Sequence, residues 1–183
     1  MNVDITLPDG SVRNYESPVT GYQIAESIGP RLLKDAICVE IDNKFQDLSY
    51  EISENINIRI VTTKDLDALH ILRHSSAHIL AQAVLNLYPN AQFGVGPSIE
   101  NGFYYDFLFE TPIKENELEK IEKEMKRIAK SAQSFIRSEI TKKDAVKIFK
   151  NQELKLELIE SAESDEGVGE EIVSTYANDE FID

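Results

Sequence analysis

The chain opens with alternating apolar and polar positions, the pattern of a strand that buries one face. Val3 to Leu7 alternates in this way and leads into Pro8-Asp9-Gly10, whose residue types favour a tight turn. Ser11 to Tyr15 then gives a second short run of the same kind. The first fifteen residues therefore predict a β-hairpin.

A short helix and three more strands are expected after the hairpin. Thr20 is placed to cap a helix over Tyr22 to Ile28, which stops at Gly29-Pro30. The strand-like runs that follow are Ala36 to Ile41, Lys44 to Leu48 and Ile56 to Val61. This order suits a small β-grasp (ubiquitin-like) module of the α+β type. The module has no histidine and no Gly-rich phosphate loop, so we interpret it as a binding or docking domain.

The spacing of apolar positions changes from two to 3.6 around Thr62 to Asp65. From there the pattern predicts one long amphipathic helix that ends before Pro89. Its apolar positions are Leu66, Leu69, Leu72, Ile79, Leu80, Ala83, Val84 and Leu87. We place the boundary between two domains here, with the first over residues 1–63 and the second over residues 64–183.

The rest of the second domain mixes strands and helices. Ala91 to Ser98 and Gly102 to Phe109 predict a strand pair that glycines interrupt, joined by the turn-like Glu100-Asn101-Gly102. A charged helix, a strand and a helix capped by Thr141 are then expected at Glu115 to Ala132, Phe135 to Ile140 and Lys142 to Phe149. Glu153 to Ile159 suits either a helix or a strand. The acidic Glu160 to Glu171 resembles a flexible segment.

Composition sets the class of protein. A chain of 183 residues, 42% of them apolar, is long enough for two small globular domains. No run approaches the ~20 apolar residues that span a bilayer, and Met1 to Gly10 lacks the features of a secretory signal. We therefore expect a cytoplasmic protein with no membrane partner. The single cysteine, Cys38, lies in an apolar run and is expected to be a buried thiol.

Charge is distributed unevenly along the chain. The net charge of −14 argues against a whole-surface attraction to nucleic acid, and no DNA partner is expected. Lys120 to Lys150, however, holds ten basic against four acidic residues, a net of +6. Asn151 to Asp183 holds one basic against eleven acidic residues. A solvated helix face followed by an acidic tail accounts for this distribution, and contact with RNA is the alternative.

The three histidines form a stripe. All lie within nine residues at spacings of four, as His70, His74 and His78. Each step of four rotates only ~40° around a helix, so the imidazoles line one face. The small residues Ser75 to Ala77 would let a ligand or a strand approach closely. The arrangement is typical of a site, and a purely structural cluster has the same spacing.

Two kinds of chemistry suit the stripe. Histidines at i and i+4 can bind a metal ion, but a zinc site usually takes three or four protein ligands, and no Cys or His follows His78. Imidazole can also hold or deliver a proton near neutral pH. His74 and His78 have no adjacent Glu of the H-E-x-x-H type, so peptide hydrolysis is not indicated. Acid-base work is the favoured interpretation, and no metal ligand is assigned.

Two further motifs carry a resemblance to a known family. The segment Arg73 to His78, followed by Gly94 to Asp106 with its Gly-Phe-Tyr-Tyr-Asp strand, resembles the editing domain of bacterial-type threonyl-tRNA synthetases. The first sixty residues, with Ile5 to Ser11 and Ile24 to Gly29, are similar to the TGS module that precedes that domain. The resemblance covers essentially the whole chain. It implies an α+β fold in which a β-grasp domain precedes a long His-bearing helix packed on an antiparallel sheet.

The resemblance implies proofreading of tRNA(Thr) that carries serine. A synthetic site that accepts threonine cannot fully exclude serine, because one methyl group is worth only ~1 to 3 kcal/mol of discrimination. The editing site must position a water, relay its proton and stabilise the leaving ribose oxygen. The partners implied are the acceptor end of tRNA(Thr) and the remainder of the synthetase. By matching positions, His74, His78 and Lys155 would be catalytic, Tyr105, Asp183 and Gly96 would bind substrate, and His70 would be supporting structure.

One departure from the family affects the expected activity. The family continues almost directly after Phe181-Ile182-Asp183 into a Cys-x-x-x-His element, which this sequence lacks. We therefore expect weak or no hydrolysis of Ser-tRNA(Thr). ATP, Mg and Zn would belong to a synthetic domain outside this sequence, so no cofactor is expected. Two other functions stay open: a tRNA-binding or partner-binding module without chemistry, and a metal-dependent trans-editing deacylase.

Overall fold

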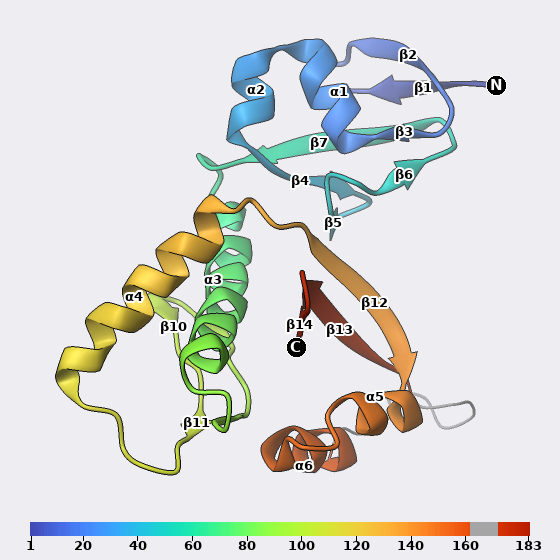
Figure 1. Ribbon diagram of the computed structural model, residues 1–183. Helices are drawn as coiled ribbons and strands as arrows, with labels where there is room; N and C mark the ends of the chain where they lie inside the picture. The colour runs from blue at the N-terminus through green and yellow to red at the C-terminus, as the bar shows by residue number, and fades with distance from the viewer. Residues whose placement is uncertain (162–171) are drawn as a thin grey trace. The chain divides into compact units, whose positions relative to one another are not determined.

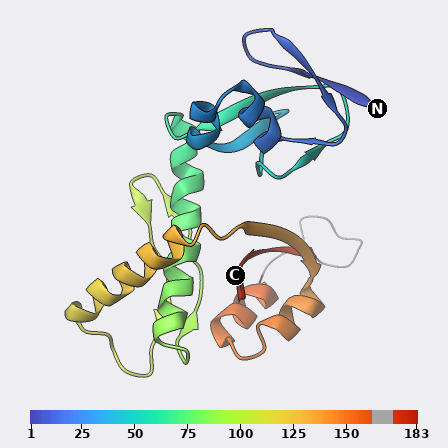
Figure 2. The same ribbon diagram turned by 45° about the horizontal axis from the view of Figure 1, so that its top comes forward.

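The computed structural model describes residues 1–161 and 172–183, and divides the chain into two compact units, residues 1–72 and 73–183. Both units combine helices and strands (Figures 1 and 2), as expected for the α+β class. The acidic segment Glu160 to Glu171, expected to be flexible, falls outside the described residues except for its first two positions, which end a helix.

The first unit is built on a five-stranded sheet. Its strands, in spatial order, are β2 (Val12–Glu16), β1 (Asn2–Thr6), β7 (Ile56–Thr62), β4 (Ala36–Ile41) and β5 (Lys44–Gln46). Only β1 and β7 pair in parallel. The remaining elements are β3 (Val19–Thr20), β6 (Glu51–Ile52), α1 (Gly21–Ile28) and α2 (Pro30–Asp35), with β3 paired to β6. This is a β-grasp-like arrangement, as predicted.

Local hydrogen bonds explain the first two elements. In the turn of the hairpin, the Asp9 carboxylate accepts from the backbone N–H and the hydroxyl of Ser11, and Gly10 has a φ of 81°. A side chain at such a φ is disfavoured, so a glycine suits this position. Thr20 caps α1 by accepting from the N–H of Gln23 at 3.2 Å, and the Gln23 side chain accepts from the Thr20 N–H at 2.9 Å. The predicted turn and cap are both confirmed.

The core of the first unit is apolar. Valines and isoleucines from the sheet and α1 form it: Val3, Ile5, Val19, Ile24, Val39, Ile41, Ile52 and Ile58. Cys38 is 4% exposed, and burial raises the pKa of its thiol to about 11, so the predicted buried thiol is confirmed. The sequence did not indicate α2, because Pro30 was interpreted as a stop. Pro30 instead occupies the first turn of α2, where its missing N–H costs nothing.

The long helix α3 runs from Leu66 to Leu87, and its predicted start and end are confirmed. Its first turns differ from expectation, since Leu66 is 86% exposed although it was assigned to the apolar face. Later in the helix, burial occurs on more than one side. Ala81 belongs to one core cluster, while Ala83 and Val84 belong to another. Small side chains at these positions let neighbouring elements approach the helix closely.

The second unit surrounds the later part of α3. Its elements are β8 (Gln92–Phe93), β9 (Ser98–Ile99), β10 (Gly102–Phe103), β11 (Phe107–Leu108), α4 (Glu115–Lys130), β12 (Phe135–Thr141), α5 (Lys142–Ile148), α6 (Glu153–Ser161), β13 (Ile172–Asn178) and β14 (Phe181–Ile182). β12, β13 and β14 form an antiparallel sheet in that order. Figure 1 shows α5 and α6 at one end of this sheet. The segment Glu153 to Ile159, for which the sequence left helix and strand open, lies in α6 and is helical.

The predicted strand pair after Pro89 is only partly correct. The chain forms two short ladders, β8 with β11 and β9 with β10, in place of one continuous hairpin. Between them, Gly94 donates to the Asp106 carbonyl and Asp106 donates to the Val95 carbonyl. Pro97 has no N–H to continue a ladder, which explains the interruption. β13 and β14 were not anticipated at all, and they carry the chain to Asp183.

Candidate active site

His74 and His78 form a pair on α3. Their Nε2 atoms lie 3.1 Å apart, and the ring centroids are 4.5 Å apart with the rings nearly perpendicular. His78 is buried, at 7% exposure, whereas His74 is half-buried. The third histidine of the stripe, His70, falls in the first compact unit. The second unit therefore contains a pair of histidines, with one ring inside the protein and the other nearer the surface.

Asp183 lies next to this pair. It follows β14, and backbone hydrogen bonds in both directions join it to Tyr176 on β13. Its Oδ2 atom lies 2.6 Å from Nδ1 of His78 and 2.7 Å from the hydroxyl of Tyr105. Its Oδ1 atom accepts from the ammonium group of Lys155. Three side chains from separate parts of the second unit, His78 on α3, Tyr105 in the loop before β11 and Lys155 on α6, thus converge on one carboxylate.

Two of the neighbours keep the Asp183 carboxyl ionised. Burial is the strongest single influence and would raise its pKa, but the hydrogen bond from His78 and the charge of Lys155 together lower it to about 2. At neutral pH the group is therefore a carboxylate that only accepts hydrogen bonds. It follows that Nδ1 of His78 carries a hydrogen and donates it to Asp183.

The charge of Asp183 also determines which ring nitrogens of His78 and His74 carry hydrogen. When His78 is neutral with its hydrogen on Nδ1, its Nε2 atom carries a lone pair. His74 then donates from its own Nε2 atom to that lone pair across the 3.1 Å contact. The basic lone pair of the neutral His74 is consequently on Nδ1. Asp183, His78 and His74 form a chain along which a proton taken up by His74 is stabilised by a buried negative charge.

Tyr105 is held as a hydrogen-bond donor. Burial, followed by the negative charge of Asp183, raises its pKa, so its hydroxyl stays protonated. A Cβ atom built on Gly96 would collide with the ring of Tyr105, so the backbone at position 96 approaches that ring as only glycine allows. At Gly94, by contrast, the nearest atom to such a Cβ would be the Cβ of Asp106 at 3.5 Å, an ordinary contact. Gly96 therefore borders the site through Tyr105.

Lys155, on α6, is enclosed by aromatic rings. Its ammonium group donates to Asp183 and, at 3.2 Å, to the hydroxyl of Tyr105. The same group lies 4.9 Å from the centroid of the Phe93 ring, a favourable position for a cation next to a π-system. The Lys155 side chain is 14% exposed. Its positive charge is therefore fixed inside the site and partly balances that of Asp183.

Several residues of the site were not identified from the sequence. The Tyr176 ring lies 5.5 Å from the His74 centroid and 5.1 Å from the His78 centroid, and Phe135 on β12 lies 6.2 Å from His78. Gln82 donates to the Asn178 carbonyl and accepts from the Asn178 side chain. One signal was available, because Gln82 is four residues after His78 and continues the stripe. The strand residues gave none, since their neighbourhood in the sequence is acidic and irregular.

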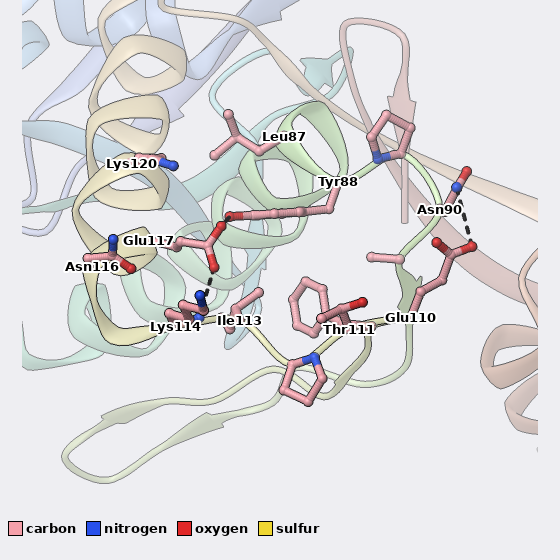
Figure 3. Close-up of a pocket in the computed structure, with 14 residues that line it drawn as sticks. Leu87, Tyr88, Asn90, Glu110, Thr111, Ile113, Lys114, Asn116, Glu117 and Lys120 are labelled. Carbon is pink, nitrogen blue, oxygen red and sulfur yellow. Dashed lines mark hydrogen bonds between the residues drawn. The ribbon is translucent and has the colours of Figure 1, made fainter.

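The structure also has a cavity of about 540 Å³ elsewhere in the second unit (Figure 3). It lies between the end of α3 and the loop that leads into α4. Several polar groups drawn in Figure 3 bond to one another: Tyr88 donates to Glu117, and Asn90 donates to Glu110. None of the six residues assigned to the site by resemblance lines this cavity.

The described part of the chain offers no ligand set for a metal ion. Among the described residues, there is no group of three or more His, Cys, Asp or Glu side chains arranged to hold a metal ion. Both ring nitrogens of His78 face protein partners, Asp183 and His74.

Within residues 1–161 and 172–183, no helix is long and apolar enough to cross a membrane.

Comparison with protein families identifies the first unit. Residues 3–62 match the family model described as the TGS domain. In the comparison with solved structures, a crystal structure of ATBAG1 in complex with HSP70 is 11% identical to the chain with a TM-score of 0.27, a similarity too weak to inform the fold.

Comparison with known proteins extends the similarity to nearly the whole chain. A threonine–tRNA ligase of Francisella philomiragia subsp. philomiragia is 44% identical over 183 residues, which is 99% of this chain and 28% of that protein. The corresponding protein of Ralstonia nicotianae is 43% identical over the same shares. That of Paraburkholderia phytofirmans is 49% identical over 87% of this chain and 25% of its own length. The chain thus spans about a quarter of the relatives it matches, consistent with their N-terminal region.

Proposed function

We propose that this chain is the N-terminal region of a threonine–tRNA ligase and that its second unit is an editing region for mischarged Ser-tRNA(Thr), with weak hydrolytic activity in this chain. The observation that carries the proposal is the hydrogen-bonded chain from Asp183 through His78 to His74. In this proposal residues 1–63 are a docking domain and residues 64–183 are the editing domain. The partners are the acceptor end of tRNA(Thr) and the remainder of the synthetase, in the cytoplasm.

The chemistry needs little beyond positioning and proton transfer. The substrate is an activated ester, and attack by water on its carbonyl carbon expels a ribose hydroxyl of the terminal nucleotide. His74 accepts the proton of the attacking water, while His78 and Asp183 stabilise the positive charge that results. The same proton is then delivered to the leaving ribose oxygen. The overall reaction consumes one water and leaves the protein unchanged.

The other site residues have supporting roles in this proposal. Lys155 supplies a fixed positive charge near the developing negative charge on the carbonyl oxygen. Tyr105 and Asp183 provide a hydroxyl and a carboxylate that can bind the polar groups of serine, and Gly96 leaves room for the Tyr105 ring. Selectivity for serine over threonine would come from a pocket that rejects the extra methyl group.

The test is single-turnover release of serine from Ser-tRNA(Thr) by this chain in excess. A general base typically contributes on the order of 10² to 10⁴ in rate. We expect weak release that still exceeds the spontaneous rate and that falls at least about tenfold in His74→Ala by the same reasoning. His70→Ala is the matched control, because it removes the same side chain from the same helix, and it should retain activity. Release at the spontaneous rate, or equal release by His74→Ala, would contradict the proposal.

A second candidate function is binding of RNA without chemistry, which the basic stretch Lys120 to Lys150 favours. Part of its charge is already used, because Lys126, Arg127, Arg137 and Lys147 each form an ion pair with an acid within four residues. If docking is the whole function, tRNA affinity should fall with salt, and Lys126→Ala and Lys142→Ala should weaken it. His74→Ala should then leave tRNA affinity and ester lifetime unchanged.

A further inference from the structure

The histidine stripe of α3 continues into a buried pair of amide side chains. Gln82 and Asn178 are 6% and 2% exposed, respectively. Nδ2 of Asn178 donates to Oε1 of Gln82 at 2.6 Å, and Nε2 of Gln82 donates to the backbone carbonyl of Asn178 at 3.2 Å. Gln82 therefore binds both the side chain and the main chain of Asn178. We call this pair the amide clamp.

The amide clamp binds the end of β13, next to the turn that leads to Asp183. Asn178 ends β13 and pairs with Phe181 across a turn in which Asp179 has a φ of 58°. Gln133 lies on the other side, where it accepts from Gln82 at 3.3 Å and donates to Asp179 at 3.2 Å. Only two residues of β14 separate this turn from Asp183. A shift of the turn relative to α3 would therefore move the carboxylate relative to His78.

The spacing of helix and strand makes the contacts consistent. Four residues of α-helix advance about 6 Å, and two residues of strand advance about 7 Å. The step from His78 to Gln82 on α3 thus matches the step from Tyr176 to Asn178 on β13, which share one face of the strand. His78 contacts Tyr176, and Gln82 contacts Asn178. Successive residues of the stripe on α3 therefore contact alternate residues of β13.

The choice of asparagine at this position is costly for stability. Oδ1 of Asn178 is the one buried side-chain polar atom without a partner in the part of the chain that the structure describes. A buried unsatisfied acceptor destabilises a fold, and an apolar side chain would avoid that loss. The Nδ2 atom of the same side chain donates to Gln82, and this hydrogen bond is a reason for an asparagine at position 178.

From this geometry we infer that Gln82 and Asn178 are positioning residues that hold Asp183 in hydrogen-bonding register with His78. The inference rests on the proposed function for its purpose, because the Asp183 to His74 chain is the relay proposed above. Neither residue touches the reacting atoms. Both act through Asp183, whose carboxylate sets which nitrogen of His78 carries the hydrogen.

The test is nuclear magnetic resonance of the whole chain, with ¹⁵N labels on the histidines and ¹³C labels on the aspartates. Gln82→Met keeps the volume but removes the two hydrogen bonds to Asn178 and the one to Gln133. We expect the Nδ1–H form of His78, dominant in the original chain, to lose its dominance, and the pKa of the Asp183 side chain to rise from about 2 towards 3.8. Asn86→Met is the matched control, because Asn86 is exposed one turn later on α3 and donates to Glu124 instead. It should change neither signal.

A merely structural role would lower the melting temperature of Gln82→Met without moving the His78 tautomer or the Asp183 titration, and that result would overturn the inference. If Gln82→Met does not melt cooperatively, Gln133→Met decides, because it removes the two hydrogen bonds of a half-buried side chain, to Gln82 and Asp179, and leaves those between Gln82 and Asn178 in place. A smaller shift in the same direction supports the inference, and unchanged spectra refute it. These signals need no tRNA, so they can succeed or fail independently of serine release. Where release occurs, Gln82→Met should slow it at least about tenfold.

Discussion

The two units of this chain bury different kinds of side chain. In the first unit, the buried core consists of valines, isoleucines and alanines together with Cys38. The four buried polar or charged residues among those that the structure describes all belong to the second unit: His78, Gln82, Thr175 and Asn178. Burying a polar group costs stability unless it is hydrogen-bonded. His78 and Gln82 are hydrogen-bonded, but Oδ1 of Asn178 has no partner, so among the described residues this loss of stability falls next to the region where chemistry is proposed.

The charged clusters of the two units show the same contrast. In the first unit, Arg59 pairs with Glu40, Asp65 and Asp67, and these side chains are 21% to 51% exposed. Exposed ion pairs of this kind contribute little, because water screens them. In the second unit, the side chains of Asp183 and Lys155 are 5% and 14% exposed. There the charges are shielded from water and can determine the protonation of a neighbouring histidine.

The largest expected effect lies in the apolar core. Ile5→Ala removes a fully buried side chain from β1 and should destabilise the first unit by about 3 kcal/mol, since it leaves a cavity. Urea unfolding measures this loss, with Val12→Ala, at an exposed position, as the control. The Asp183 titration should stay as it is. A changed Asp183 titration in Ile5→Ala would contradict the contrast between the two units, because the stability of one core would then affect the other.

The next effect concerns pH. Because the pKa of Asp183 is lowered by folding, from 3.8 to about 2, its contribution to stability is complete above pH 4 and is lost as the pH falls through 2. Asp183→Asn should therefore reduce the free energy of unfolding by about 2 kcal/mol at neutral pH, and the difference should vanish near pH 2. Unfolding curves between pH 2 and 7 test this. Asp65→Asn in the first unit should give a smaller difference, because Asp65 is more exposed.

Gly96→Ala tests the close approach at Tyr105. Its methyl group would overlap the ring, so we expect a loss of about 2 kcal/mol in stability, as in other overpacked sites, together with displacement of the Tyr105 hydroxyl from Asp183. Thermal unfolding and the tyrosine ring signals measure the two effects. Gly94→Ala is the matched control and should be nearly neutral. Equal losses in both variants would show that the ring contact is not the cause.

The smallest expected effect should be alike in the two units. Thr20 caps α1 in the first and Thr141 caps α5 in the second, each by accepting a backbone N–H. Replacing either by alanine should cost about 1 kcal/mol, measured by urea unfolding. Thr20→Ala should cost somewhat more, since its capping box with Gln23 is also broken. A much larger loss at Thr141 would mean that α5 also supports the site.

Elements with a local cause were predictable from the sequence. The hairpin turn at Asp9 to Ser11, the Thr20 and Thr141 caps and the span of α3 all depend on residues within a few positions of one another. The missed elements depend on distant partners. β13 pairs with β12, from which α5 and α6 separate it along the chain, and β14 pairs with β13; neither strand has a strong pattern of its own.

The sequence by itself determined that His74 and His78 share one face of a helix, because a spacing of four imposes this in any α-helix. Only the tertiary structure decided which residues meet them. Asp183 lies 105 positions after His78 in the chain, and Asn178 lies 96 after Gln82. Such contacts come from sheet register and helix packing, which no local pattern specifies. For this reason helix periodicity predicted the helical half of the candidate site, Asp183 was assigned by resemblance alone, and folding brought that carboxylate and the amide clamp to the helix.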